Sequence, residues 1–180
     1  MLSHGELEIF CKQTEPDFGD IRRVVLSVHG LGGSTVDEIQ TGIAEEMEMF
    51  SCATFRFDFP AHGESPLDST YLNLENCVNS LYTVACHAKE TYPEVEDLCI
   101  FATGFGAYMV LICLEELVQL PGKIRLVVQT PSVMMHETLL SMKNISRPTF
   151  QAMGEISFTE NGNSITVTLL YWDSSIVLER

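Results

Sequence analysis

The chain has 180 residues, of which 46% are apolar, and 10 basic against 25 acidic residues give a net charge of −15 at pH 7. This length and apolar fraction predict one packed domain and exclude intrinsic disorder. The acidity argues against partners with phosphate backbones and against anionic membrane surfaces, because binding to either requires clustered basic side chains.

The N-terminal residues 1–6 lack the basic and apolar regions of a signal peptide. No apolar run reaches the roughly 20 residues that span a bilayer. The six cysteines lie in or beside apolar segments and form no Cys-x-x-Cys pair, which favours buried free thiols in a reducing compartment over disulfides. We therefore expect a cytoplasmic protein that binds no metal and needs no cofactor.

Apolar periodicity predicts strands that alternate with helices. The expected strands are residues 7–12, 23–28, 52–57, 97–103 and 124–129. The expected helices are residues 37–50, 72–91 and 107–120. In the first of these helices, an apolar stripe recurs at helical spacing and comprises Ile39, Ile43, Met47 and Phe50. The alternation predicts an α/β fold with a mostly parallel sheet flanked by helices.

The alternation weakens after Pro131. A short helix is expected at residues 134–143, and two β-like segments, 156–159 and 164–170, flank the turn-forming residues 161–163. No interdomain linker is visible. We expect residues 1–131 to form the core of one domain, and residues 132–180 to form a partial lid-like or edge segment of the same domain.

Three loops follow strands at the predicted carboxyl edge of the sheet, where α/β proteins bind ligands. The first is His29-Gly30-Leu31-Gly32-Gly33, whose glycines allow backbone N–H groups to face a developing negative charge. The second spans residues 58–65 and reads Asp-Phe-Pro-Ala-His-Gly-Glu-Ser. The third, residues 102–106, reads Ala-Thr-Gly-Phe-Gly and is predicted to be a tight turn between a strand and a helix.

In their order and spacing, the three motifs resemble the α/β-hydrolase family, nearest to its small serine esterases and serine aminopeptidase-like members. The resemblance covers residues 7–131. It implies that the third loop is the nucleophile elbow, Gly-x-Ser-x-Gly, and that the backbone N–H groups of Leu31 and Phe105 form an oxyanion hole for a small ester or acyl ligand. The resemblance also implies that a set of residues shapes these loops. This set is His29, Gly30, Gly32, Asp58, His62, Gly63 and Gly106.

The sequence departs from the family pattern at the position of the nucleophile. Gly104 stands where the family has serine, and glycine has no side chain that could form an acyl-enzyme. No histidine follows His136, and Asp173 is the only late aspartate, so the acid and the base of the triad are not found. The family's last strands are also expected to be missing. We therefore expect a pseudoenzyme without serine hydrolase activity, derived from a hydrolase that cleaves esters or amides by acyl transfer.

One alternative is an active hydrolase that uses another nucleophile or a C-terminal piece beyond Arg180. Thr103 and Ser65 are the substitute nucleophiles within the chain, and His136 is the substitute base. However, Thr103 is expected to point to the wrong side of the elbow, and Ser65 lacks an evident base. His136 is expected on a short surface helix.

A second alternative is a nucleotide-binding, Rossmann-like domain. The segment from Gly30 to Thr35 follows a strand, and Asp58 ends the next strand, which imitates a dinucleotide fingerprint. Thr35 occupies the position where that fingerprint has its third glycine.

The predicted strand at residues 124–129 is expected to form an unpaired sheet edge that the hairpin at residues 156–170 covers in part. Such an edge exposes unpaired backbone groups and promotes strand pairing between molecules. We therefore expect self-association that increases with ionic strength, because salt screens the repulsion between chains of charge −15.

Overall fold

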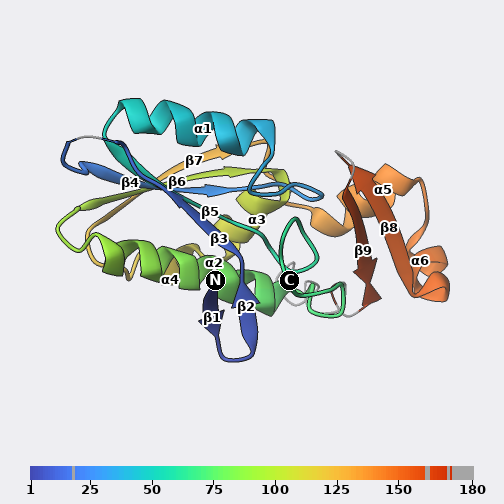
Figure 1. Cartoon of the computed structure of the whole chain (residues 1–180). Helices are drawn as coiled ribbons and strands as arrows, with labels where there is room; N and C mark the ends of the chain where they lie inside the picture. Colours follow the sequence, from blue (N-terminus) through green and yellow to red (C-terminus); the bar gives the residue numbers. More distant parts are fainter. Residues whose placement is uncertain (18, 161–162, 170, 172–180) are drawn as a thin grey trace.

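The computed structural model describes residues 1–17, 19–160, 163–169 and 171. Its centre is a five-stranded sheet with the order β3-β5-β4-β6-β7 (Figure 1). In that order the strands are Cys11–Thr14, Cys52–Phe57, Arg23–Val28, Asp97–Thr103 and Lys123–Gln129. β5, β4, β6 and β7 run parallel, and β3 pairs antiparallel with β5. This confirms the predicted α/β fold with a mostly parallel sheet.

Helices cover the two faces of the sheet unequally. α1 (Glu38–Met49) lies on one face, and α2 (Leu74–Thr91), α3 (Gly104–Ile112) and α4 (Leu114–Leu117) lie on the other (Figure 1). α2 is capped by Asn73, whose side chain accepts a hydrogen bond from the Asn76 N–H. The helix buries apolar side chains at helical spacing, among them Cys77, Leu81 and Val84. No described helix combines the length and apolarity needed to cross a bilayer.

α1 contradicts the prediction of which residues it buries. The residues that it buries are Gln40 and Ala44, whereas Ile39 and Phe50, members of the predicted apolar stripe, are exposed. The reason is that the sheet beneath α1 is polar. Ser27 of β4 donates a hydrogen bond of 2.7 Å from its Oγ to Oε1 of Gln40, so the helix turns its amide toward the sheet.

Several element boundaries differ from the predictions. Residues 7–12 form two strands, because β2 (Leu7–Ile9) pairs with β1 (Leu2–His4) in a separate hairpin while β3 joins the main sheet. The predicted tight turn at residues 104–106 is the first turn of α3. The predicted helix at residues 107–120 is interrupted at Cys113.

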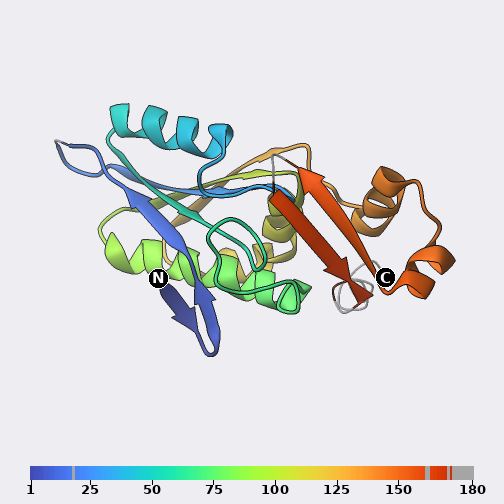
Figure 2. The same ribbon diagram turned by 45° about the vertical axis from the view of Figure 1, so that its right-hand side comes forward.

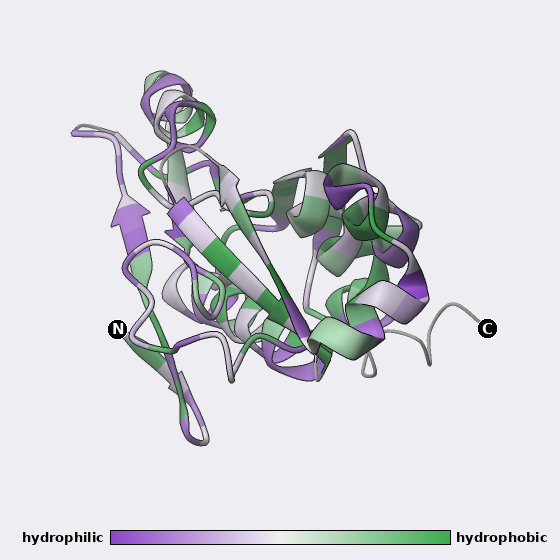
Figure 3. Cartoon of the chain, turned by 90° about the vertical axis from the view of Figure 1, so that its right-hand side faces the viewer, coloured by the Kyte–Doolittle hydropathy of each residue, from purple (hydrophilic) through white to green (hydrophobic). Residues whose placement is uncertain are grey.

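The C-terminal part forms a helical pair and a hairpin beside the carboxyl ends of the strands (Figures 1 and 2). These elements are α5 (Met135–Lys143), α6 (Arg147–Met153), β8 (Glu155–Glu160) and β9 (Asn163–Thr168). Figure 3 shows apolar and polar residues alternating along the hairpin, whose buried side chains are Ile156, Phe158, Ile165 and Val167. Asn163 donates a 2.9 Å hydrogen bond to the Gly32 carbonyl, so the hairpin touches the first glycine-rich loop. Leu170, the end of the second predicted segment, lies outside the described residues.

All six cysteines are free, as expected from their spacing. Burial raises the pKa of the Cys113 thiol to about 12 and also raises the pKa of the Cys77 thiol. Both thiols are therefore protonated at neutral pH, which makes them poor nucleophiles.

The edge of the sheet at β7 is open in the described part of the chain. β7 pairs only with β6 there, and the hairpin β8–β9 forms a sheet of its own, so the expectation that this hairpin covers the β7 edge is wrong. We predict that the hydrodynamic radius measured by light scattering increases from low to high ionic strength, as β7 edges pair once repulsion is screened. A monomer of constant size across this range would contradict the prediction.

Candidate functional site

A cavity of about 390 Å³ lies at the carboxyl ends of β4 and β6, directly beside Gly104. Its walls come from the first glycine-rich loop, the junction of β6 and α3, the segment after β7, and α5. Leu31, Phe105 and Ser132 are among the lining residues, together with the apolar side chains of Ile39 and Met142. This is the edge at which parallel sheets bind ligands.

Gly104 occupies a strand-to-helix turn with open space in front of it. Its φ is +48°, in the left-handed region that favours glycine. A Cβ built at this position would have the Cα of Gly30 as its nearest neighbour, at 3.9 Å. Packing therefore leaves room for a side chain at residue 104.

Gly106 is in the opposite situation. A Cβ there would lie 2.3 Å from the His29 carbonyl oxygen and 2.8 Å from Cγ1 of Val28. Only glycine allows α3 to approach the end of β4 this closely. The close approach brings the first turn of α3 against the first glycine-rich loop.

Two residues that line the cavity, one from each of these segments, have a backbone N–H without an acceptor in the described part of the chain. Phe105 belongs to the first turn of α3, where N–H groups have no partner within the helix, and Leu31 comes from the glycine-rich loop. Neither N–H has an acceptor among the described residues. Both N–H groups are thus available as hydrogen-bond donors, next to the positive end of the α3 dipole.

His29 has a structural role in the first loop. Its Nδ1 lies 2.7 Å from the Gly30 carbonyl oxygen, to which it donates, because its Nε2 accepts a hydrogen bond of 3.2 Å from the Phe59 N–H. Burial lowers the pKa of His29, so the ring is neutral at pH 7. Both ring nitrogens are engaged within the protein, which leaves none for catalysis.

Asp58 holds the first and second loops together from a buried position. One carboxylate oxygen accepts from the Thr35 N–H at 2.6 Å, and the other accepts from the Glu64 N–H at 2.9 Å. A Cβ at Gly63 would clash with this carboxylate, which explains the glycine there. Because Asp58 is buried and fully bonded, it cannot contact a ribose, and the nucleotide-binding alternative is not favoured.

His62 is buried next to Phe105, a residue that lines the cavity. Its Nδ1 donates to the Pro60 carbonyl oxygen at 2.8 Å, and its ring stacks on Phe105 with an interplanar angle of 9° and a centroid distance of 6.2 Å. Burial lowers the pKa of His62 to about 3. The neutral ring therefore packs against the side chain of Phe105.

No family model and no curated protein matches the sequence. Among solved structures, a protein from Agrobacterium vitis S4 matches with a TM-score of 0.75 and 15% identity over 97% of this chain and 69% of its own. Est1E from Butyrivibrio proteoclasticus gives 0.71 and 14% over 96% and 66%. Mouse alpha/beta hydrolase domain-containing protein 10 gives 0.66 and 11% over 97% and 68%.

The chain has the α/β-hydrolase fold. It spans about two thirds of the length of the three α/β-hydrolase-type structures that it matches. Because the identity to each of them is 15% or less, the likeness shows the fold alone.

The substitute catalytic residues do not assemble at this α/β-hydrolase cavity. Thr103 lines it, whereas Ser65 does not. His136 is buried in α5 with 3% exposure, which corrects its expected position on the surface. None of the five histidines of the chain lines the cavity, so Thr103 has no imidazole base there. Asp173 lies outside the described residues.

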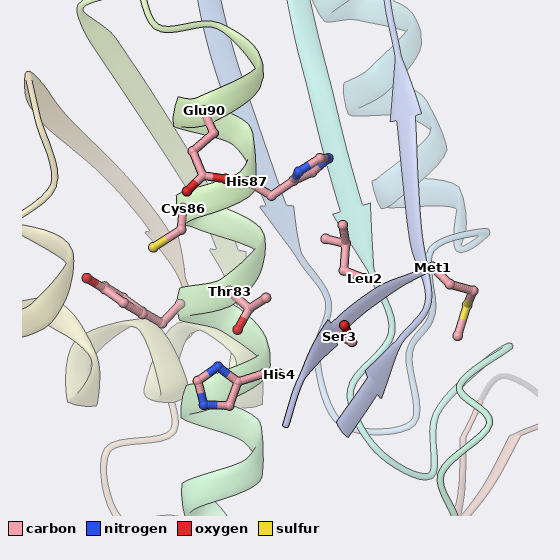
Figure 4. Close-up of a pocket in the computed structure, with 9 residues that line it drawn as sticks. Met1, Leu2, Ser3, His4, Thr83, Cys86, His87 and Glu90 are labelled. Carbon is pink, nitrogen blue, oxygen red and sulfur yellow. The ribbon is translucent and has the colours of Figure 1, made fainter. Parts of the chain in front are cut away.

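A larger cavity, of about 460 Å³, lies between β1 and α2, on a different part of the α/β-hydrolase fold (Figure 4). His4, Cys86, His87 and Glu90 line it. His87 packs edge-on against Phe55, with ring centroids 5.7 Å apart. No three His, Cys, Asp or Glu side chains of the described residues are arranged to hold a metal. This cavity has no glycine-rich loop and is not the candidate site.

The buried histidines make the stability of the α/β-hydrolase fold sensitive to acid. Below pH 6.5, the ordinary pKa of histidine, the unfolded chain takes up a proton on His62 but the folded chain does not, so protons favour unfolding. We predict that this histidine alone lowers the free energy of unfolding by about 1.4 kcal/mol per pH unit between about pH 6 and pH 4.

Urea unfolding at a series of pH values measures this slope. His62→Phe removes the titrating group and is expected to flatten the profile, and His4→Gln, at an exposed position, is the matched control. Equal profiles for the unchanged chain and His62→Phe would contradict the assignment.

Proposed function

We propose that this chain binds a small ester or acyl compound in the cavity beside Gly104 and does not hydrolyse it through an acyl-enzyme. The observation that carries the proposal is the pairing of two free N–H groups, from Leu31 and Phe105, with a nucleophile position that has no side chain. The site can therefore accept a carbonyl oxygen but cannot attack the carbonyl carbon through residue 104.

The cavity suggests the chemical class of the ligand. Ile39 and Met142 supply apolar surface for an acyl chain, and the N–H groups of Leu31 and Phe105 supply donors for the carbonyl. The Asp37 carboxylate also lines the cavity. Because it repels anions, the site favours a neutral ester or amide over a free carboxylate.

We expect binding without turnover because no histidine base lines the cavity. A hydroxyl becomes a strong nucleophile when an adjacent base takes its proton. Thr103 is the candidate hydroxyl at the elbow, and no histidine lines the cavity beside it. An oxyanion hole without nucleophile and base leaves only the weak catalysis that binding provides.

The experiment is a titration of the ¹⁵N-labelled chain with ethyl butyrate, followed by amide chemical shifts. We expect saturable shifts at Leu31 and Phe105 and no release of butyrate. Gly30→Leu fills the cavity and should abolish the shifts. Gly42→Leu is the matched control, because a Cβ at Gly42 meets nothing within 4 Å. Shifts spread over the surface, or steady formation of butyrate, would contradict the proposal.

A further inference from the structure

A second cavity borders the Gly104 cavity at the start of α1. It has a volume of about 400 Å³. The residues that line both cavities are Gly30, Asp37, Ile39 and Thr103. Glu38 and Gln40 complete the walls of the second one. A ligand whose carbonyl lies in the Gly104 cavity therefore has a neighbouring space for a substituent.

Asp37 lines both cavities, and its carboxylate is held in place there. It is the N-cap residue of α1, but its side chain makes no capping hydrogen bond to the helix. Instead, Oδ2 accepts from the Ser34 N–H at 2.8 Å, and Oδ1 accepts from the Ser34 hydroxyl at 3.0 Å. Because Asp37 is half-buried, water screens its charge less than that of a carboxylate on the open surface.

The Asp37 carboxylate also lies against the first glycine-rich loop. Residues 30–33 form a tight turn, which a 3.0 Å hydrogen bond from the Gly33 N–H to the Gly30 carbonyl closes. A Cβ built at Gly33 would lie 2.6 Å from Oδ2 of Asp37. Leu31, one of the two cavity residues with an available N–H, belongs to the same turn. The carboxylate is therefore packed against the four-residue turn that carries this donor.

The side chains around the two cavities carry a net negative charge. Asp37 and Glu38 line them, whereas no Lys, Arg or His does. Among the described residues, neither carboxylate forms an ion pair. The N-termini of α1 and α3 contribute positive charges of about 0.5 each, which offset only about half of the charge of the two carboxylates.

This charge determines which substituent the second cavity favours. A cleft lined by charge of one sign concentrates ions of the opposite sign, so the site attracts a cationic group and repels an anionic one. Asp37 contributes most of the effect, because Glu38 is exposed and salt screens its charge. A ligand with an ammonium group a few bonds from its carbonyl can interact with both the N–H donors and the Asp37 carboxylate.

We propose that the ligand of the Gly104 cavity is an acyl compound that carries an ammonium group, and that Asp37 selects this ligand. The carbonyl accepts from the N–H groups of Leu31 and Phe105, and the ammonium group contacts the Asp37 carboxylate. This inference rests on the proposed binding of an ester or acyl compound in the same cavity and adds the charge of that compound. The test must separate it from general attraction of cations to a chain of charge −15.

The test compares two esters of nearly the same shape, ethyl butyrate and ethyl 3-aminopropanoate. The second has an ammonium group where the first has its terminal methyl group, so the two differ mainly in charge. Amide chemical shifts of Leu31 and Phe105 in the ¹⁵N-labelled chain measure the affinity for each ester. Asp37→Asn removes the charge but keeps an oxygen that can accept from the Ser34 N–H. Asp17→Asn is the matched control, because it removes the same charge from an exposed residue between β3 and β4, near the amino end of β4.

We expect the unchanged chain to bind the ammonium ester at least about tenfold more tightly than ethyl butyrate. Asp37→Asn should reduce this preference by about fivefold or more and leave the affinity for ethyl butyrate within about twofold. Asp17→Asn should leave the preference within about twofold, because exposed charges contribute little. Equal affinities for the two esters, a preference that Asp37→Asn leaves intact, or equal losses in both variants would overturn this inference while the proposed function stands. Absence of shifts with both esters would overturn the two together.

Discussion

A Gly104→Ser variant is expected to hydrolyse p-nitrophenyl butyrate no faster than the unchanged chain. The variant regains a hydroxyl at the elbow, and the space beside Gly104 accommodates it. Attack still requires a base, and none of the five histidines lines the cavity. Loss of the base of a triad costs on the order of 10⁶-fold in rate even when the serine is present. The measurement is release of p-nitrophenol under saturating ester.

Gly104→Ala is the matched control, because alanine carries the same strain at a φ of +48° without the hydroxyl. The two variants should have rates within about twofold of each other, since neither forms an acyl-enzyme. Saturable turnover by Gly104→Ser well above that of Gly104→Ala would show that the chain holds a working base. Combination with His136→Gln would then test the substitute base directly.

The second large effect is expected at Gly106. Gly106→Ala should lower the free energy of unfolding by about 3 kcal/mol or prevent folding, which places it among severe core substitutions. The new Cβ would lie 2.3 Å from the His29 carbonyl oxygen and 2.8 Å from Val28. Relief of this overlap requires α3 to move away from β4, and the first glycine-rich loop would move with it.

Urea unfolding of Gly106→Ala and Gly42→Ala together provides a controlled comparison. A Cβ at Gly42 of α1 meets nothing within 4 Å, so Gly42→Ala should stabilise the chain by up to about 1 kcal/mol. The two identical substitutions are thus expected to have opposite signs. A loss of less than about 0.5 kcal/mol for Gly106→Ala would contradict the tight packing of α3 on β4.

The main sheet could be predicted from the sequence because its strands are short β-branched runs separated by clear helical patterns. β4 and β6 needed no information beyond this alternation. α6 was missed because residues 147–153 have no apolar repeat. Its start was nevertheless signalled, since Ser146 stands two residues before Pro148. In the structure Ser146 caps the helix, and its hydroxyl accepts from the Thr149 N–H.

The candidate site was predictable where glycine and short motifs determine the backbone. The structure brings Leu31, Phe105 and Gly104 to one cavity, as their motifs indicate. His136 was misplaced because burial depends on what packs over α5.

The side of α1 that is buried could not be predicted from the sequence. A stripe such as Ile39, Ile43 and Met47 is typical of the buried side of a helix. In the structure the buried side is Gln40 and Ala44, because the strands below present Ser27 and other polar groups. Which flank of a helix is buried depends on the sheet beneath it, and the stripe alone carries no information about that sheet.

The most direct test of the account is reaction of the unchanged chain with a fluorophosphonate, followed by intact mass spectrometry. This reagent forms a covalent adduct with activated serine or threonine hydroxyls, and the central claim is that the Gly104 cavity contains none. We predict that the mass of the chain is unchanged after prolonged reaction, and that p-nitrophenyl acetate gives no burst of p-nitrophenol. A stoichiometric adduct on any serine or threonine, Thr103 above all, would contradict it.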